Sequence, residues 1–368
     1  MHRTNTVRLN KTFATTAAMR TSFRMTGNRL GVSYSLILLV ALFTGLIGYK
    51  GYSGLSKLQH VLGSGTLELR DDLLRTSSGS AKFGFLVRSG EYLQIVWPAL
   101  LFGILIAAAV HAFVSPAWLL RRLGEGAIRG QVAAAMAGTP LMLCSCCASP
   151  LFAATYERSS RLSPSLALML ASPGMNPASL ALCFMLFPTR LAVARVVMTL
   201  VAVLLASALP ELLMPGASQH AYQMLSIPVA EPKTSGLRES LATYLRSCGH
   251  VAIRTVPLVV LGTLIAMLIP SRLLIQTFAS FGGATVVIAL VALFVLPLAL
   301  PSFFEIPLAF SILAAGAPLG AAAAVLFAGP IVNLPSLLVV GRYAGWKVPA
   351  LLAMSVWVIA FLGGIVLR

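Results

Sequence analysis

Three cysteines lie within four positions of an apolar stretch, and their spacing predicts a site for a soft atom. Cys144, Cys146 and Cys147 fall between Pro140 and Pro150. Because proline interrupts helical geometry, side chains two positions apart can face the same way there. Sulfur ligands select soft metals and, by the same logic, trivalent metalloids. We expect Cys144 and Cys146 to contact a solute that carries such an atom, with Cys147 a less favoured contact. The alternative is that the three cysteines are small buried residues that only pack.

The same cluster permits a second chemistry. Cys144 and Cys147 have the C-x-x-C spacing of thiol-redox motifs. A membrane-embedded protein that carries out thiol-redox chemistry is therefore one alternative to a protein that binds a soft solute. A channel, or a subunit of a larger complex, is a third.

Glu305 is the acid that lies deep in an apolar segment. Ionisable groups at such depth are rare and usually functional. We expect Glu305 to couple transport to protons; a neutral carboxyl group bonded to a freed carbonyl is the alternative.

Two asparagines follow interruptions marked by Pro173 and Pro330. Asn176 and Asn333 either cap the interrupted helices or line the path of a solute, and the two roles are compatible.

These residues belong to a repeated pattern. A shift of 157 positions places Pro140, Pro150 and Pro173 on Pro297, Pro307 and Pro330, Asn176 on Asn333, and Ser145 on Ser302. Two halves with matching interrupted hydrophobic segments are typical of secondary transporters. Interrupted backbone is tolerated in lipid only where it faces protein or a wet cavity. We therefore expect the six prolines to mark helix breaks that converge on one polar site, with Ser145 and Ser302 shaping it.

Composition sets the class of the elements that hold this site. Hydrophobic residues make up 58% and charged residues 10%, an apolar excess that rules out a soluble enzyme and requires lipid. The formal charge of +17 fits loops beside an anionic leaflet better than nucleic-acid binding. We predict an all-α polytopic membrane protein with about nine apolar segments: 33–49, 92–114, 128–157, 163–187, 191–209, 250–270, 284–315, 319–340 and 348–367.

The expected organisation has five parts. Residues 1–31 form a basic tail, 32–90 an additional span and polar loop, 91–209 the first repeat, 210–247 a linker, and 248–368 the second repeat. The basic tail places the N-terminus in the cytoplasm, at an inner membrane. Counting Arg158 and Arg161 against Arg190, Arg195 and Arg272 leaves open whether the repeats are parallel or inverted.

At Cys144-Ser145-Cys146, Pro150-Leu151 and Pro173 with Asn176, the chain resembles the bacterial predicted-permease family that includes the organoarsenical efflux permeases. A degenerate second copy follows at Ser302, Pro307-Leu308, Pro330 and Asn333. The resemblance covers residues 91–367 and leaves 1–90 outside. It implies a permease that exports a trivalent organoarsenical or another soft solute. Cys147 stands where the family usually has glycine, which removes backbone freedom and adds a third sulfur.

The expected function is therefore that of an integral-membrane permease and not of an enzyme. Its partners are a small soft or metalloid-containing solute, the lipid bilayer and protons, without nucleic acid. We expect no cofactor and no permanently bound metal.

Overall fold

The computed structural model describes residues 40–49, 51–52, 55–56, 59, 84–113, 127–159, 161–214, 237–267, 283–300, 303–314 and 316–368. Every regular element in this described part is a helix, which confirms the all-α prediction. The expected basic tail and most of the polar loop and linker lie outside the described residues, as does Ser302.

The main helices of the described residues lie in this order along the chain. They are α3 (Gly84–Phe113), α5 (Ala127–Gly138), the 3₁₀ turn η2 (Thr139–Leu141), α6 (Ser145–Ser159), α7 (Leu162–Gly174), α8 (Pro177–Leu186), α9 (Thr189–Val201), the π-helical turn η3 (Ala202–Ala206), α10 (Ser207–Leu213), α12 (Leu237–Met267), α14 (Ala284–Val295), α15 (Glu305–Ala314), α16 (Leu319–Ile331), α17 (Leu334–Ala344) and α18 (Lys347–Val366).

Among the described residues, four helices are long and apolar enough to cross a membrane. They are Val96–Phe113, Thr189–Leu213, Leu241–Ile265 and Lys347–Val366. Two bent pairs raise the number to six if each is one span: α7 with α8, bent by 43°, and α16 with α17, bent by 48°. Fewer spans result than the nine expected segments, because stretches 128–157 and 284–315 each form two shorter helices, and the described part of 33–49 is the short apolar helix Val40–Tyr49.

Several helix bounds recur at a constant offset. α5 and α14 begin and end 157 residues apart, at Ala127–Gly138 and Ala284–Val295. α7 and α16 do the same, at Leu162–Gly174 and Leu319–Ile331. Each of these two longer apolar helices is followed by an asparagine and then by a bend.

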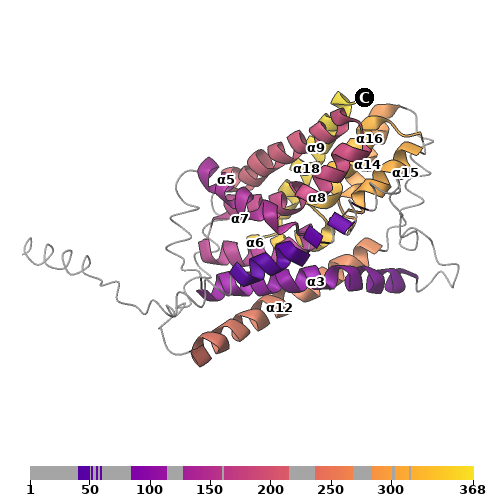
Figure 1. Cartoon of the computed structure of the whole chain (residues 1–368). Helices are drawn as coiled ribbons and strands as arrows, with labels where there is room; N and C mark the ends of the chain where they lie inside the picture. The colour runs from indigo at the N-terminus through magenta and orange to yellow at the C-terminus, as the bar shows by residue number, and fades with distance from the viewer. Residues whose placement is uncertain are drawn as a thin grey trace, which may run out of the picture.

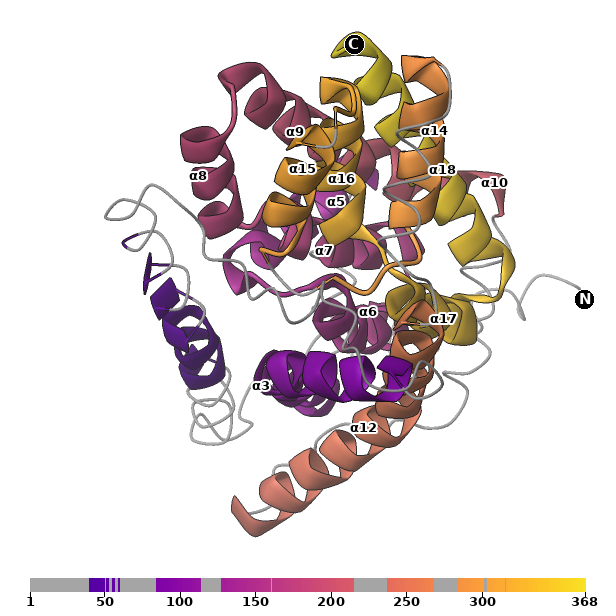
Figure 2. The ribbon, with the colours of Figure 1, turned by 90° about the vertical axis from the view of Figure 1, so that its right-hand side faces the viewer.

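The helices pack around two buried ones. Nearly every residue of α7 and α16 is buried, and these two helices contact each other. α3 and α12 lie side by side on one flank of the molecule (Figures 1 and 2), and α6 packs against both of them and against α7. The start of α6 therefore lies inside the protein, which is where the cysteines are.

Candidate functional site

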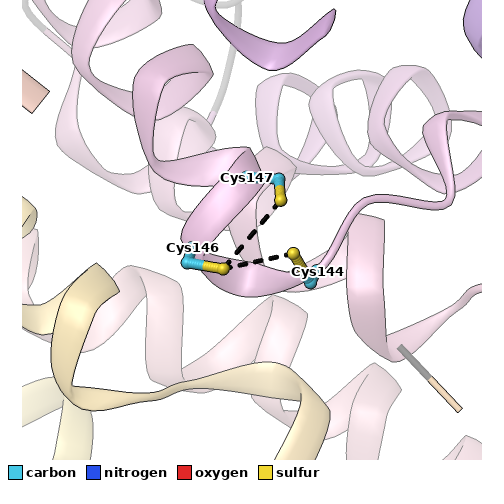
Figure 3. Close-up of side chains that lie close together, drawn as sticks. All are labelled: Cys144, Cys146 and Cys147. Atoms are coloured by element: carbon cyan, nitrogen blue, oxygen red, sulfur yellow. Dashed lines mark hydrogen bonds between the residues drawn. The ribbon is translucent and has the colours of Figure 1, made fainter. Parts of the chain in front are cut away.

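The three cysteines form a compact sulfur cluster at the start of α6 (Figure 3). Cys144 Sγ lies 3.2 Å from Cys146 Sγ, which lies 3.9 Å from Cys147 Sγ. All three are free thiols and are buried. The sulfurs of all three residues lie within 4.8 Å of one another, so the cluster brings together both expected cargo contacts and the less favoured third one.

An interruption of the backbone makes this arrangement possible. Residues 142–144 separate η2 from α6, and Met142 has a φ of 50°, a left-handed conformation that non-glycine residues rarely adopt. Leu143 N–H donates to Ser172 Oγ at 3.2 Å, which ties this interruption to the end of α7. The non-helical backbone before α6 is what allows Cys144 and Cys146 to turn towards each other.

α3 covers the sulfur cluster from one side, which the sequence analysis did not anticipate. Tyr92 is fully buried, and its hydroxyl oxygen lies 3.4 Å from Cys146 Sγ. A Cβ added to Gly103 would overlap the Cys147 carbonyl oxygen, so glycine permits the close approach of α3 to α6. The signal for Gly103 was present in the sequence, since a shift of 159 positions places Pro98 and Gly103 on Pro257 and Gly262 in the second half. Tyr92 carried no such signal.

Two of the expected helix breaks are wrong. Pro150 is the sixth residue of α6, and Pro307 is the third residue of α15. The carbonyl that Pro150 cannot satisfy belongs to Cys146, and it accepts a hydrogen bond from Ser149 Oγ at 2.7 Å. Pro307 lies in the first helical turn, where a missing N–H costs no intrahelical bond.

The other four prolines lie at or beside interruptions. Pro140 is in η2 and Pro297 is in the turn after α14. Pro173 and Pro330 lie in the last turns of α7 and α16, just before the two bends.

Both expected asparagines cap helices. Asn176 Oδ1 accepts from Ala178 N–H and Ser179 N–H at the start of α8, at 3.1 and 3.4 Å. Asn333 Oδ1 accepts from Ser336 N–H at 3.0 Å at the start of α17. Ser336 Oγ accepts in return from Asn333 N–H at 3.2 Å, so the pair forms a capping box. The capping role is thus confirmed, while a role in the solute path stays a prediction.

Glu305 has a partner that the sequence analysis missed. Arg195 Nη2 lies 3.1 Å from Glu305 Oε1, with relative exposures of 0% for the arginine and 2% for the glutamate side chain. Ser179 Oγ donates to the same carboxylate oxygen at 2.6 Å and accepts from Arg195 Nη2 at 2.9 Å. Arg195 Nη1 also donates to Cys183 Sγ at 2.8 Å. A buried charge is tolerated when it is paired in this way.

Arg195 is not the loop charge that the sequence predicts. It lies within α9 and is fully buried. Arg158, which the sequence also predicts as a loop charge, is buried too. Neither residue therefore reports on topology. The sequence did carry a signal for Arg195, because it is a basic residue inside a hydrophobic segment. The argument that singled out Glu305, that ionisable residues deep in apolar segments are usually functional, applies to Arg195 as well.

The two bends lie close together. A Cβ on Gly174, at the end of α7, would lie 3.1 Å from Ile331 Cγ1, at the end of α16. A Cβ on Gly329 would lie 3.8 Å from Glu305 Cβ. Through Ser172, Gly174 and Ser179, the described contacts connect the sulfur cluster with both bends and with the Arg195–Glu305 pair.

In the described part of the chain, seven buried side-chain polar atoms lack a hydrogen-bond partner, and three of them belong to residues of the expected site. Within the described part of the chain, Ser145 Oγ, Glu305 Oε2 and Asn333 Nδ2 are buried and have no hydrogen-bond partner. Each such atom costs free energy unless a ligand or water satisfies it. Three residues of the expected site therefore carry a buried polar atom that a ligand or water would stabilise.

Comparison with known proteins places the chain in a family. Residues 10–212 match the family model described as "Predicted permease". The chain is similar to UPF0718 protein YraQ of Escherichia coli (strain K12), at 29% identity over 277 residues, 72% of this chain and 76% of the relative. It is also similar to UPF0718 protein MJ0584 of Methanocaldococcus jannaschii, at 28% identity over 92 residues, 25% of each chain. No solved structure matches.

The extent of the match corrects the earlier expectation. The resemblance placed residues 1–90 outside the family, but the matched region begins at residue 10. The resemblance rested on motif residues, which all lie beyond position 140, so it carried no information about the earlier segment. With the match spanning more than half of the chain, and with the apolar helices described above, the protein is a multi-pass membrane protein that belongs to the predicted-permease family.

Proposed function

We propose that this protein is a secondary transporter of the inner membrane that exports a small soft or metalloid-containing solute, such as a trivalent organoarsenical. The observation that carries the proposal is the buried sulfur cluster, with Cys144 and Cys146 Sγ atoms 3.2 Å apart and Cys147 Sγ beside them. Trivalent arsenic and antimony form pyramidal bonds to sulfur, and soft ligands select such atoms. Three sulfurs suit a solute with up to three exchangeable positions.

The neighbouring polar atoms support a binding role. Ser145 Oγ and Asn333 Nδ2 lack partners in the described residues and offer hydrogen bonds to a polar group of the solute. Asn176 and Ser302 complete the proposed site, with Ser302 outside the described residues. The Cys144 region and the two bends are joined through α7, so a change at one end of the site displaces the other.

The alternating movement rests on an internal repeat. The 157-residue offset of α5 and α14, and of α7 and α16, supports two repeated halves. α16 packs against α7, so the halves meet at their bent helices. In transporters of this kind, one repeat rocks against the other around the site.

Glu305 is the proposed proton-coupling group. Arg195 comes from the first repeat and Glu305 from the second, so their ion pair joins the two halves. Protonation of Glu305 removes the counter-ion of a fully buried guanidinium, which is costly. Proton uptake at Glu305 would therefore loosen the contact between the halves and link proton movement to rocking.

The remaining parts of the proposal concern the surroundings. The proposed transport needs no cofactor and no permanently bound metal at the sulfur cluster, and the protein is not an enzyme. The basic N-terminal segment places the N-terminus in the cytoplasm, and the anionic lipid surface is its partner in place of nucleic acid.

A transport assay tests the proposal. The purified protein is reconstituted into liposomes, and phenylarsenite is either loaded into the liposomes or added outside. Its movement is measured with and without an imposed proton gradient. We expect gradient-dependent movement that Cys144→Ser and Cys146→Ser each abolish, because two sulfurs hold the arsenic. Cys248→Ser is the matched control, since Cys248 lies on α12 outside the cluster. Equal transport by the cluster variants and the control would contradict the assignment, and gradient-independent leakage would favour a channel.

Thiol-redox activity is the second candidate, and the same sulfur spacing favours it. Cys144 and Cys146 Sγ atoms need to approach by about 1 Å to reach the S–S bond length of about 2.05 Å. Oxidation to a disulfide releases two electrons and two protons to an acceptor such as a quinone. Trapping of thiols during transport separates the two functions. A redox protein accumulates a disulfide in the cluster during turnover, whereas a permease moves solute with all thiols reduced.

A further inference from the structure

A second group of ligand-type side chains joins three helices away from the sulfur cluster. This histidine–glutamate cluster consists of His111 near the end of α3, Glu157 near the end of α6 and His250 on α12. One ligand atom from each lies within 4.8 Å of the others. Glu157 follows Cys147 by ten residues of the same helix, which is about 15 Å. The cluster is therefore separate from the proposed cargo site.

The distances within the cluster fit a bound ion better than direct hydrogen bonds. His111 Nε2 lies 3.6 Å from Glu157 Oε2, and His250 Nε2 lies 3.8 Å from Glu157 Oε1. Both distances exceed the usual range for a hydrogen bond. A tetrahedral zinc ion with bonds of about 2.0–2.1 Å holds its ligand atoms about 3.3 Å apart. Small side-chain rotations would bring the cluster to that spacing.

The neighbours of His111 and His250 hold the rings in place. His111 Nδ1 lies 3.4 Å from Ser247 Oγ. When Nδ1–H donates to that hydroxyl, the Nε2 lone pair faces the carboxylate, and two acceptors repel unless a cation lies between them. Metal-bound histidines are commonly held through their other ring nitrogen in this way. The two imidazole rings stack, with centroids 5.4 Å apart and an interplanar angle of 29°, so each ring packs against the other.

Two arginines beside Glu157 carry positive charges that repel a metal ion, and one of them must leave the carboxylate before the ion can bind. Arg254 Nη1 lies 3.1 Å from Glu157 Oε1, and its side chain is 47% exposed. It occupies one carboxylate oxygen and can swing into solvent when a metal arrives. Arg158, next to Glu157 in the chain, is buried and adds a second positive charge. Oxygen Oε2 faces His111, which leaves it available as a ligand.

We propose that His111, Glu157 and His250 form a binding site for a divalent cation of the zinc class. His111 Nε2, His250 Nε2 and Glu157 Oε2 are the ligands, and imidazole with carboxylate suits zinc, cobalt and nickel. The three side chains are only partly buried, so water can fill the fourth position and the ion can enter from outside. The ion would fasten α3, α6 and α12 to one another. This site stands independently of the transport proposal.

Cobalt binding to the full-length, untagged protein in detergent tests the site. Cobalt(II) bound by nitrogen and oxygen gives visible d–d bands without the near-ultraviolet charge-transfer band of cobalt–thiolate bonds, so the spectrum distinguishes this cluster from the cysteines. We expect one cobalt per chain, without the thiolate band, and displacement by zinc. His250→Ala and His111→Ala should each raise the Kd at least about tenfold.

Two further variants sharpen the test. Arg254→Gln should lower the Kd, because it removes the cation that competes for Glu157. Glu91→Gln, which changes an exposed carboxylate on α3 twenty residues before His111, is the matched control and should leave the Kd unchanged. The site would be overturned by unchanged cobalt binding in both His111→Ala and His250→Ala, or by a cobalt–thiolate band. Weaker cobalt binding by Arg254→Gln, or no binding by the wild type at millimolar cobalt, would also overturn it. Circular dichroism checks that the variants fold. If His111→Ala does not fold, the result for His250→Ala decides whether the site exists.

Discussion

Arg195 and Glu305 form an ion pair between α9 and α15, at 3.1 Å, with both side chains withdrawn from solvent. The pair joins residues 110 positions apart and shares Ser179 Oγ as a third partner. Its charges are compensated only by each other and by neighbouring polar groups. The stability of this part of the fold therefore depends on both residues together.

Removing one partner should destabilise the protein strongly. Arg195→Met or Glu305→Leu leaves a buried charge without a counter-ion, and we expect a loss of about 3–5 kcal/mol. The double variant should recover much of that loss, because it removes both charges. Thermal unfolding in detergent measures the effect through a double-mutant cycle.

The control for this prediction is the partly exposed pair between Arg161 Nε and Glu211 Oε1, at 3.5 Å. Arg161→Gln should cost at most about 1 kcal/mol, since solvent screens the charges. Equal losses from the buried and the partly exposed pair would show that burial does not strengthen the Arg195–Glu305 contact.

The close approach of α3 to α6 should depend on Gly103. A Cβ at this position would overlap the Cys147 carbonyl oxygen. Gly103→Ala should therefore force the helices apart and cost about 1–3 kcal/mol. Gly90→Ala on the same helix, where a Cβ would meet nothing within 4 Å, should be neutral or slightly stabilising. Unfolding temperatures of the two variants give the comparison, and a neutral Gly103→Ala would refute the packing.

Cysteine reactivity should follow burial. Cys248 is partly buried, whereas Cys144, Cys146, Cys147 and Cys183 are buried. A maleimide added to the intact protein should label Cys248 first and the other four only after denaturation. Mass spectrometry of peptides reads out each position. Early labelling of the sulfur cluster would show that its thiols are open to solvent in the resting protein.

The capping and binding roles of Asn333 can be separated. Asn333→Ala removes the acceptor for Ser336 N–H and should cost about 1 kcal/mol. Asn333→Ser keeps a good capping oxygen but lacks the amide nitrogen, which has no partner in the described residues. We expect Asn333→Ser to unfold like the wild type while binding phenylarsenite more weakly. Wild-type binding by Asn333→Ser would leave Asn333 with a capping role alone.

The sequence by itself determined the all-α membrane class, the bends after Pro173 and Pro330, the capping asparagines and the gathering of three cysteines. These features depend on composition, on backbone chemistry at proline and asparagine, and on neighbours close in the chain. Local patterns therefore carry them.

Only the tertiary structure decided the partners across helices. It placed Arg195 beside Glu305, Tyr92 beside Cys146, and His111 and His250 around Glu157. Such contacts depend on which helix faces pack together, and the periodicity of a nearly uniform apolar sequence does not specify those faces.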